Sequence, residues 1–164
     1  HQVVKIYVAK INKDPFSLFN KTFQLNTKDQ DIMKILVEQE HNGFKIDNNW
    51  IKIEGYIKRS NINRMKMQFT PISLGPNGGK YSCTYILPLN KNEILVRIET
   101  GRMHQIRATL EYLGVNIIND SLYATKKGKG GVPEEIELKS ILISFLKQNE
   151  ERVTYNLLKN EKKK

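Results

Sequence analysis

The residues best suited to chemistry stand together in one string, Thr100 to Arg107 (TGRMHQIR). Gly101 ends an apolar, strand-like run and helical spacing begins just after it, so the string lies at a strand-to-helix junction. Backbone N–H groups at such a junction can bind phosphate, and Arg102 or His104 can add a side-chain contact. A histidine that only fixes the turn by hydrogen bonding, with Gln105 as a brace, explains His104 equally well.

The charge balance favours a polyanionic partner. The chain has 27 Lys and Arg against 17 Asp and Glu, for a formal net charge of +10. Nucleic acid is the first candidate and an anionic membrane surface the second. A Lys- and Asn-rich codon bias would give the same excess, so the charge alone leaves the question open. No apolar run approaches the ~20 residues that a membrane span needs, and we expect no membrane partner.

Metal chemistry and disulfides find little support. The single cysteine, Cys83, has no partner for a disulfide within the chain, and His1, His41 and His104 lack the spacing of a zinc site. We therefore expect no structural metal. A reduced intracellular compartment follows, either the cytoplasm or an organelle.

The elements that must position these residues are mostly strands. Apolar, β-branched or alternating runs predict them at 3–11, 50–56, 65–69, 81–89, 93–99, 115–118 and 137–145. The cluster Gly75 to Gly79 (GPNGG) predicts a hairpin loop between two strands. The clearest helix is Met103 to Leu113, closed by Gly114.

The remaining segments complete a single α+β domain. Residues 16–49 are polar and read as a surface insertion that carries one short helix near 29–40. Residues 1–155 then form one domain with a mixed, mainly antiparallel sheet flanked by few helices. The basic run at 156–164 reads as a disordered tail.

Several strings together resemble a known family. Thr100 to Arg107, with Leu113-Gly114 and Asp120 to Tyr123 (DSLY), is similar to the TGRxHQIR…LG…DxLY signature of RNA pseudouridine synthases of the RluA type. Lys5 to Ala9 resembles the family's KxYxA strand and Arg64 to Met67 its RxKM segment. The resemblance implies the C-terminal part of that family's catalytic domain, covering most of the chain outside 16–49.

The resemblance also implies a reaction. Members isomerise specific uridines in ribosomal or transfer RNA to pseudouridine, need no cofactor and usually act as monomers. Tyr7 would stack on the flipped uracil and relay the released proton, and Arg107 would pair with the catalytic aspartate. Without the resemblance, Tyr7 reads as a core tyrosine and Arg107 as half of a surface salt bridge. Contacts to RNA would come from Arg102, His104, Gln105, Arg64 and Lys66. By their charge, candidates for the path of the RNA backbone are Lys58, Arg59, Arg64, Lys66 and the loop 126–129.

Two departures from the family pattern matter. The Gly-Asp that precedes the family's DxLY tyrosine is Asn119-Asp120 here, and asparagine tolerates the left-handed backbone that glycine would adopt. The HRLD motif, which holds the catalytic aspartate, has no counterpart between His1 and Lys164. In relatives it precedes the KxYxA strand, so we expect it upstream of His1 and expect this chain alone to be inactive.

A second class of function stays open. A non-catalytic RNA-binding module, or a degenerate synthase that keeps the fold without the reaction, would show the same residues. The presence of the aspartate upstream of His1 separates an enzyme from these alternatives.

Overall fold

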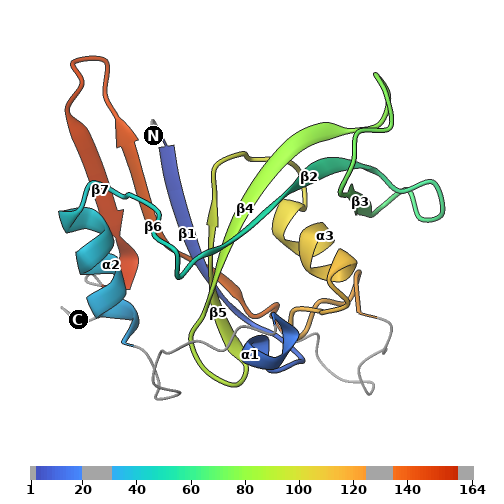
Figure 1. Ribbon diagram of the computed structural model, residues 1–164, viewed down its shortest axis with the longest axis horizontal. Coiled ribbons are helices and arrows are strands. Elements are labelled where there is room, and N and C mark those ends of the chain that lie inside the picture. The colour runs from blue at the N-terminus through green and yellow to red at the C-terminus, as the bar shows by residue number, and fades with distance from the viewer. Residues whose placement is uncertain (1–2, 20–30, 125–134, 159–164) are drawn as a thin grey trace.

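The computed structural model describes residues 3–19, 31–124 and 135–158 (Figure 1). The loop 126–129 and the segment 159–164 lie outside these residues. The elements in chain order are β1 (Val3–Lys10), α1 (Pro15–Leu18), α2 (Ile32–His41), β2 (Ile51–Arg59), β3 (Met67–Thr70), β4 (Lys80–Pro88), β5 (Glu93–Ile98), α3 (Gln105–Tyr112), β6 (Leu138–Leu146) and β7 (Arg152–Asn156).

One sheet organises the molecule, with the strand order β3-β2-β4-β5-β1-β6-β7. Every pairing between named strands is antiparallel. The expected α+β class with a mainly antiparallel sheet and few helices is confirmed, whereas no parallel pair, and so no mixed sheet, occurs in the part of the chain that the structure describes. None of the helices there is long and apolar enough to cross a bilayer.

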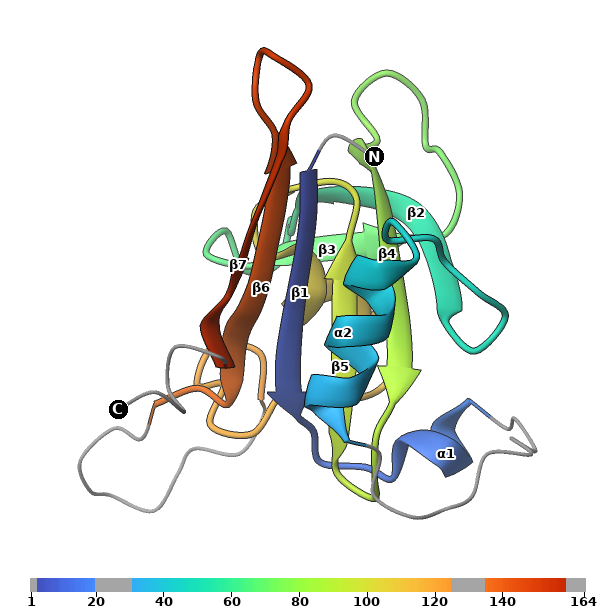
Figure 2. The same cartoon turned by 90° about the vertical axis from the view of Figure 1, so that its left-hand side faces the viewer.

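The two longer helices, α2 and α3, cover opposite faces of this sheet. Because side chains alternate along a strand, Val4 and Ile6 of β1 enter the cluster under α2, while Tyr7 and Ala9 enter the cluster that α3 covers. Figure 2 shows α2 in front of the sheet and α3 behind it. The α2 face and the α3 face are therefore separate surfaces.

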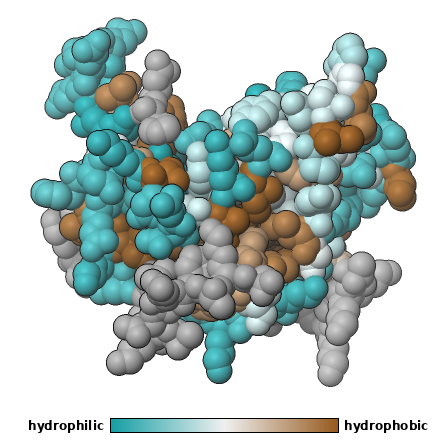
Figure 3. Space-filling view, in the orientation of Figure 1, coloured by the Kyte–Doolittle hydropathy of each residue, from teal (hydrophilic) through white to brown (hydrophobic). Residues whose placement is uncertain are grey.

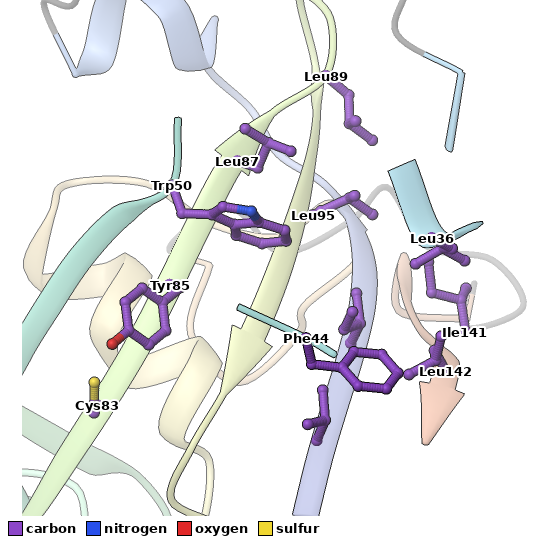
Figure 4. Packing of buried hydrophobic residues seen from close by; sticks show 12 residues of the cluster. Leu36, Phe44, Trp50, Cys83, Tyr85, Leu87, Leu89, Leu95, Ile141 and Leu142 are labelled. Carbon is purple, nitrogen blue, oxygen red and sulfur yellow. The ribbon is translucent and has the colours of Figure 1, made fainter. Parts of the chain in front are cut away.

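The α2 face is closed by residues of the segment predicted to be an insertion. Leu36 of α2 and Phe44 are almost fully buried, and Trp50, directly after that segment, is 6% exposed. Figure 4 shows the Phe44 ring beside Leu142. Under them lies Arg97 of β5, which is 1% exposed and donates from Nη1 to Gln39 Oε1 (2.9 Å) and Phe44 O (2.7 Å). A charged side chain thus ties α2 and the turn after it to the middle of the sheet.

The α3 face is closed by the predicted helix. Ile106 and Leu110 pack on buried residues of β1, β4 and β5, while Ala108 and Tyr123 pack on Ile57 and Phe69 at the β2–β3 end. Leu113 caps α3 and Gly114 follows with φ +79°, the left-handed conformation that glycine accepts without strain. The C′ role predicted for Gly114 is confirmed.

A β-bulge interrupts the pairing of β1 with β6. Ile6 opposes Leu142 and Tyr7 opposes Ser140, so Ile141 is the extra residue. Ile141 and Leu142 consequently both enter the cluster on the α2 face although they are neighbours in sequence. The small Ser140 is left opposite Tyr7 on the α3 face.

The predicted hairpin at Gly75 to Gly79 is wrong. β2 lies between β3 and β4 and pairs with both, so the loop 71–79 crosses the end of β2 rather than joining two paired strands. The turn signal was real, since Gly78 N donates to Gly75 O (2.9 Å) and Gly75 and Gly79 have positive φ. Turn chemistry fixes where a chain bends and leaves the pairing partner undetermined.

The other differences concern short or exposed segments. The strand predicted at 115–118 is a single bridge between Ile11 and Ile117. β7 was not predicted, and it carries Asn156, 7% exposed, at the point where the tail was expected to begin. The part of the predicted insertion that is described forms α1, α2 and the turn to β2, with α2 confirming the expected helix.

Leu36→Ala will lower the free energy of unfolding by about 2–5 kcal/mol, because a fully buried side chain that joins α2 to the sheet leaves a cavity. Val37→Ala, at the neighbouring position that is 47% exposed, will change it by less than about 0.5 kcal/mol. Urea unfolding of both variants measures the difference. Equal effects would mean that α2 is not docked on the sheet as described.

Candidate active site

Gln105 fixes the start of α3 against β4. Its Oε1 accepts from Thr100 Oγ1 (2.7 Å) and from Arg102 N (3.1 Å), and its Nε2 donates to Cys83 O (3.1 Å) and Thr84 Oγ1 (2.9 Å). The side chain is 3% exposed. A fully engaged buried amide is a brace, so this geometry favours the bracing role over the expected RNA contact.

Arg107, one turn into α3, makes a bidentate ion pair. Nε donates to Asp120 Oδ2 (2.9 Å) and Nη2 donates to Asp120 Oδ1 (2.8 Å). The arginine side chain is 21% exposed and the aspartate side chain only 1%. Nη1 makes no hydrogen bond within the described residues. The sequence pointed to Arg107 and placed Asp120 in a motif, but the partnership between them was missed.

Asp120 is oriented by its own backbone neighbours. Its Oδ1 accepts from Leu122 N (3.2 Å) and Tyr123 N (3.1 Å) as well as from the arginine. Asn119 before it has φ +66°, so asparagine takes the left-handed conformation expected at the position of the family's glycine. The sharp turn at Asn119 thus delivers the carboxylate to Arg107.

The ring of Tyr123 packs against the guanidinium of Arg107. It is 3% exposed, and the guanidinium carbon of Arg107 lies 4.7 Å from its ring centroid. Its hydroxyl accepts from Met67 N (2.8 Å) of β3 and lies 3.0 Å from Nδ1 of His104. These contacts join the DSLY and RMKM strings to α3 and give Tyr123 a packing role.

His104 begins α3 in the left-handed conformation, with φ +52°. Burial, and then the charge of Arg107, lowers the pKa of His104. The ring is therefore neutral near neutral pH, and its Nδ1 can accept the hydroxyl proton of Tyr123. This contact supports the reading in which His104 fixes the turn, while its half-buried ring leaves a contact to RNA as a prediction.

The expected RNA contacts on the RMKM string differ in their surroundings. Lys66 forms an ion pair with Glu111 of α3 and lies 4.8 Å from the Tyr123 ring centroid, so its charge is already partnered. Arg64 is exposed on the β2–β3 turn. Arg102 donates from Nε to Tyr81 O (2.7 Å) and is half-buried. Arg64 is the more open of these three cations.

The β2–β3 turn and the loop before β4 also expose apolar side chains. Figure 3 shows brown surface at this end of the molecule among teal residues. The exposed apolar residues of these two loops are Ile62, Met65, Ile72 and Leu74. Ile62 and Met65 lie close to Arg59 and Arg64 in sequence, so the β2–β3 turn mixes positive charge with apolar surface.

Tyr7 lies on the same face of the sheet as α3. It is half-buried against the cluster that contains Ile106 and Leu110. It makes no hydrogen bond to Arg107 within the described residues. The structure therefore brings the two predicted catalytic residues to one face without direct contact between them.

The interactions within the ion pair also favour the charged forms of both partners. The hydrogen bonds that Arg107 donates to Asp120 raise the pKa of Arg107 against the opposing effect of burial. Burial raises the pKa of Asp120, but hydrogen bonds from Arg107 and from Tyr123 N outweigh it and hold that pKa below its usual value. No group of three His, Cys, Asp or Glu side chains that could hold a metal occurs in the described segments.

Asp120→Asn will lower the free energy of unfolding at neutral pH by about 1–3 kcal/mol, because the guanidinium loses its ionised partner. The folded pKa of Asp120 is below the unfolded value of about 3.9. Its contribution is thus complete above that value and is lost as the pH falls through the folded pKa. Urea midpoints will show the difference between wild type and variant shrinking below about pH 4.

Asp31→Asn is the matched control for this titration. Asp31 is exposed, and its side chain accepts from Met33 N (2.9 Å) at the start of α2. Its substitution will produce a smaller change in stability. A loss in Asp120→Asn that does not vary with pH would show that charge is not what holds the pair.

Comparison with curated proteins finds relatives of one kind. The chain is 39% identical over 80 residues to an uncharacterized RNA pseudouridine synthase of Mycoplasma capricolum, covering 49% of this chain and 26% of the relative. It is 36% identical over 101 residues to another of Helicobacter pylori, covering 58% and 29%. The ribosomal large subunit pseudouridine synthase D of Zymomonas mobilis is 33% identical over 79 residues, covering 46% and 24%. No family model matches.

The fold agrees with these relatives. The human RNA pseudouridylate synthase domain containing 1 superposes with a TM-score of 0.58 at 18% identity, covering 94% of this chain and 54% of that protein. The chain spans about a quarter of the length of the curated relatives that it matches. Over about half of its own length, the chain is similar in sequence to RNA pseudouridine synthases, the family that its signature strings predicted.

Proposed function

We propose that the protein containing this chain isomerises specific uridines in RNA to pseudouridine. This chain would supply Tyr7 and Arg107. The catalytic aspartate, which has no counterpart among these 164 residues, would come from a part of the protein upstream of His1. The isolated chain would then be inactive.

The observation that carries the proposal is convergence on the α3 face. Arg107, Tyr123 and Lys66 come from three separate strings of the family signature, and they contact one another or share partners around α3. Tyr7, from a fourth string, lies on the same face. Chance matches to short motifs would have no reason to assemble on one side of a sheet.

The surroundings of Arg107 suit the binding of an ionised catalytic carboxylate. A catalytic aspartate in a base-binding pocket would be driven towards its neutral form by desolvation, and a guanidinium beside it would favour the ionised form. Arg107 keeps its Nη1 without a partner among the described residues, so it can donate to a second carboxylate. Tyr7 would stack on the flipped uracil, whose extraction from the RNA costs a few kcal/mol.

The RNA itself would lie along the basic residues of the β2–β3 turn and of the start of α3. Arg59 at the end of β2 and Arg64 on the β2–β3 turn are exposed, and Arg102 and His104 lie at the start of α3. Phosphate contacts from such residues make binding dependent on salt. The ion pair of Lys66 with Glu111 makes Lys66 a weaker candidate than Arg64, and Gln105 would act on RNA only through the turn that it braces.

Ribosomal RNA is the first substrate to test and transfer RNA the second, because two relatives are named ribosomal large subunit pseudouridine synthases. The first experiment extends the reading frame upstream of His1 and assays the full-length protein for pseudouridine in both RNAs. An HRLD-like motif with RNA modification supports the proposal. RNA binding without modification, or another residue at the aspartate position, would establish the non-catalytic alternative.

In the full-length protein, Arg107→Met will abolish pseudouridine formation, since the catalytic aspartate loses its partner, and will leave RNA affinity within about 3-fold because the ion pair is mostly buried. Arg107→Lys will retain only a small part of the activity, because lysine keeps the charge but lacks the planar fork. Single-turnover modification and filter binding measure the two effects. Normal turnover in Arg107→Met would remove this residue from the mechanism.

Tyr7→Phe in the full-length protein will keep RNA binding and lose most of the modification rate, about 100-fold or more, because stacking needs the ring and proton relay needs the hydroxyl. Tyr155→Phe is the control, since Tyr155 is an exposed tyrosine of the edge strand β7. The rate of modification under saturating enzyme is the measurement. An unimpaired rate in Tyr7→Phe would make the hydroxyl dispensable.

A further inference from the structure

Asp120 is the most deeply buried carboxylate in the described part of the chain, and both of its oxygens are used. Oδ2 accepts from Nε of Arg107, and Oδ1 accepts from Nη2 of Arg107 and from two backbone N–H groups. Its side chain is 1% exposed. The Asp120 carboxylate is thus closed to direct contact with RNA, so it can act on a reaction only by orienting Arg107 or through its own charge.

The guanidinium is held from two directions. The carboxylate fixes the edge formed by Nε and Nη2, and the Tyr123 ring lies against the guanidinium, 4.7 Å from its central carbon. A planar fork that is bonded at one edge and packed on one side has little freedom to rotate. Nη1 is the one nitrogen whose hydrogens have no partner among the described residues, and the arginine side chain is 21% exposed.

We propose that Asp120 is a positioning residue for the isomerisation: it orients the Arg107 guanidinium so that Nη1 donates to the catalytic carboxylate, and its own charge balances that of the arginine. The inference rests on the proposed function. It adds that the catalytic aspartate meets a prearranged donor within a neutral ion pair rather than a free positive charge.

The two effects of Asp120 have opposite consequences for the catalytic carboxylate. A fixed donor favours the ionised carboxylate, while the second negative charge of Asp120 opposes ionisation. Among the described residues, the other charged or titratable groups near the pair are His104 on α3, Tyr123 in the same turn, Arg59, whose charge acts on His104, and Lys66 with Glu111, which form an ion pair. Removing the charge of Asp120 therefore leaves Arg107 as the dominant uncompensated charge at the site.

Asp120→Asn in the full-length protein tests both effects. The asparagine Oδ1 can keep the two backbone N–H contacts, so the turn should survive, but the guanidinium loses its orientation. We expect kcat to fall about 10- to 100-fold, with KM for RNA unchanged. The acidic limb of the pH profile should move to lower pH by roughly one unit, because the catalytic carboxylate then faces an unbalanced arginine.

Asp120→Glu separates position from charge. The longer side chain displaces the guanidinium but keeps the negative charge, so kcat should fall while the acidic limb stays where it is. Asp31→Asn, which removes an exposed carboxylate on the opposite face of the sheet, should change neither quantity. All variants are assayed at a temperature where circular dichroism shows them folded.

The outcomes separate this inference from the function on which it rests. An inactive wild-type enzyme overturns the proposed function. An active wild type with an Asp120→Asn variant of normal kcat, or with reduced kcat and an unmoved acidic limb, overturns the positioning role alone. If neither Asp120 variant folds at any assay temperature, Asp120 is required for folding and the positioning role is likewise overturned.

Discussion

The buried side-chain amide of Gln105 determines the geometry of the α3 face. The side chain of Gln105 has to satisfy its donors and acceptors without water, and it does so between the loop before α3 and strand β4. The axis and rotation of α3 follow from that attachment, and with them the point from which Arg107 leaves the helix. Asp120 then pairs with a guanidinium whose position on α3 is already fixed. The position of the ion pair therefore depends on Gln105, an uncharged residue.

The two faces of the sheet differ in their role. The α2 face is closed by a helix and a turn that Arg97 secures from below, whereas the α3 face collects the polar and aromatic residues of the site. Burying Arg97 is energetically costly, because its Nε and Nη2 have no hydrogen-bond partner among the described residues and burial lowers its pKa. The strain of a buried charge is thus kept on the face away from the proposed chemistry.

Local pattern predicted most of the fold, because strands with one buried face alternate and α3 has an apolar stripe. Local pattern failed where the structure depends on residues distant in sequence. β2 lies between β3 and β4, and β7 is an edge strand whose mostly half-buried residues show no alternation. The site divides in the same way. Arg107 and Tyr7 stand in recognisable strings, but the pairing of Arg107 with Asp120 requires α3 and the Asn119 turn to be in place together.

The bulge at Ile141 sets a constraint on length rather than on composition. Without the bulge, Ile141 would lie opposite Tyr7, because Leu142 lies opposite Ile6. A branched side chain would then share the α3 face with the tyrosine ring. The extra residue sends Ile141 to the other face and brings a serine opposite Tyr7. β6 can therefore exchange one apolar residue for another with little effect on Tyr7, whereas losing a single residue there would straighten the strand and change the direction of the ring.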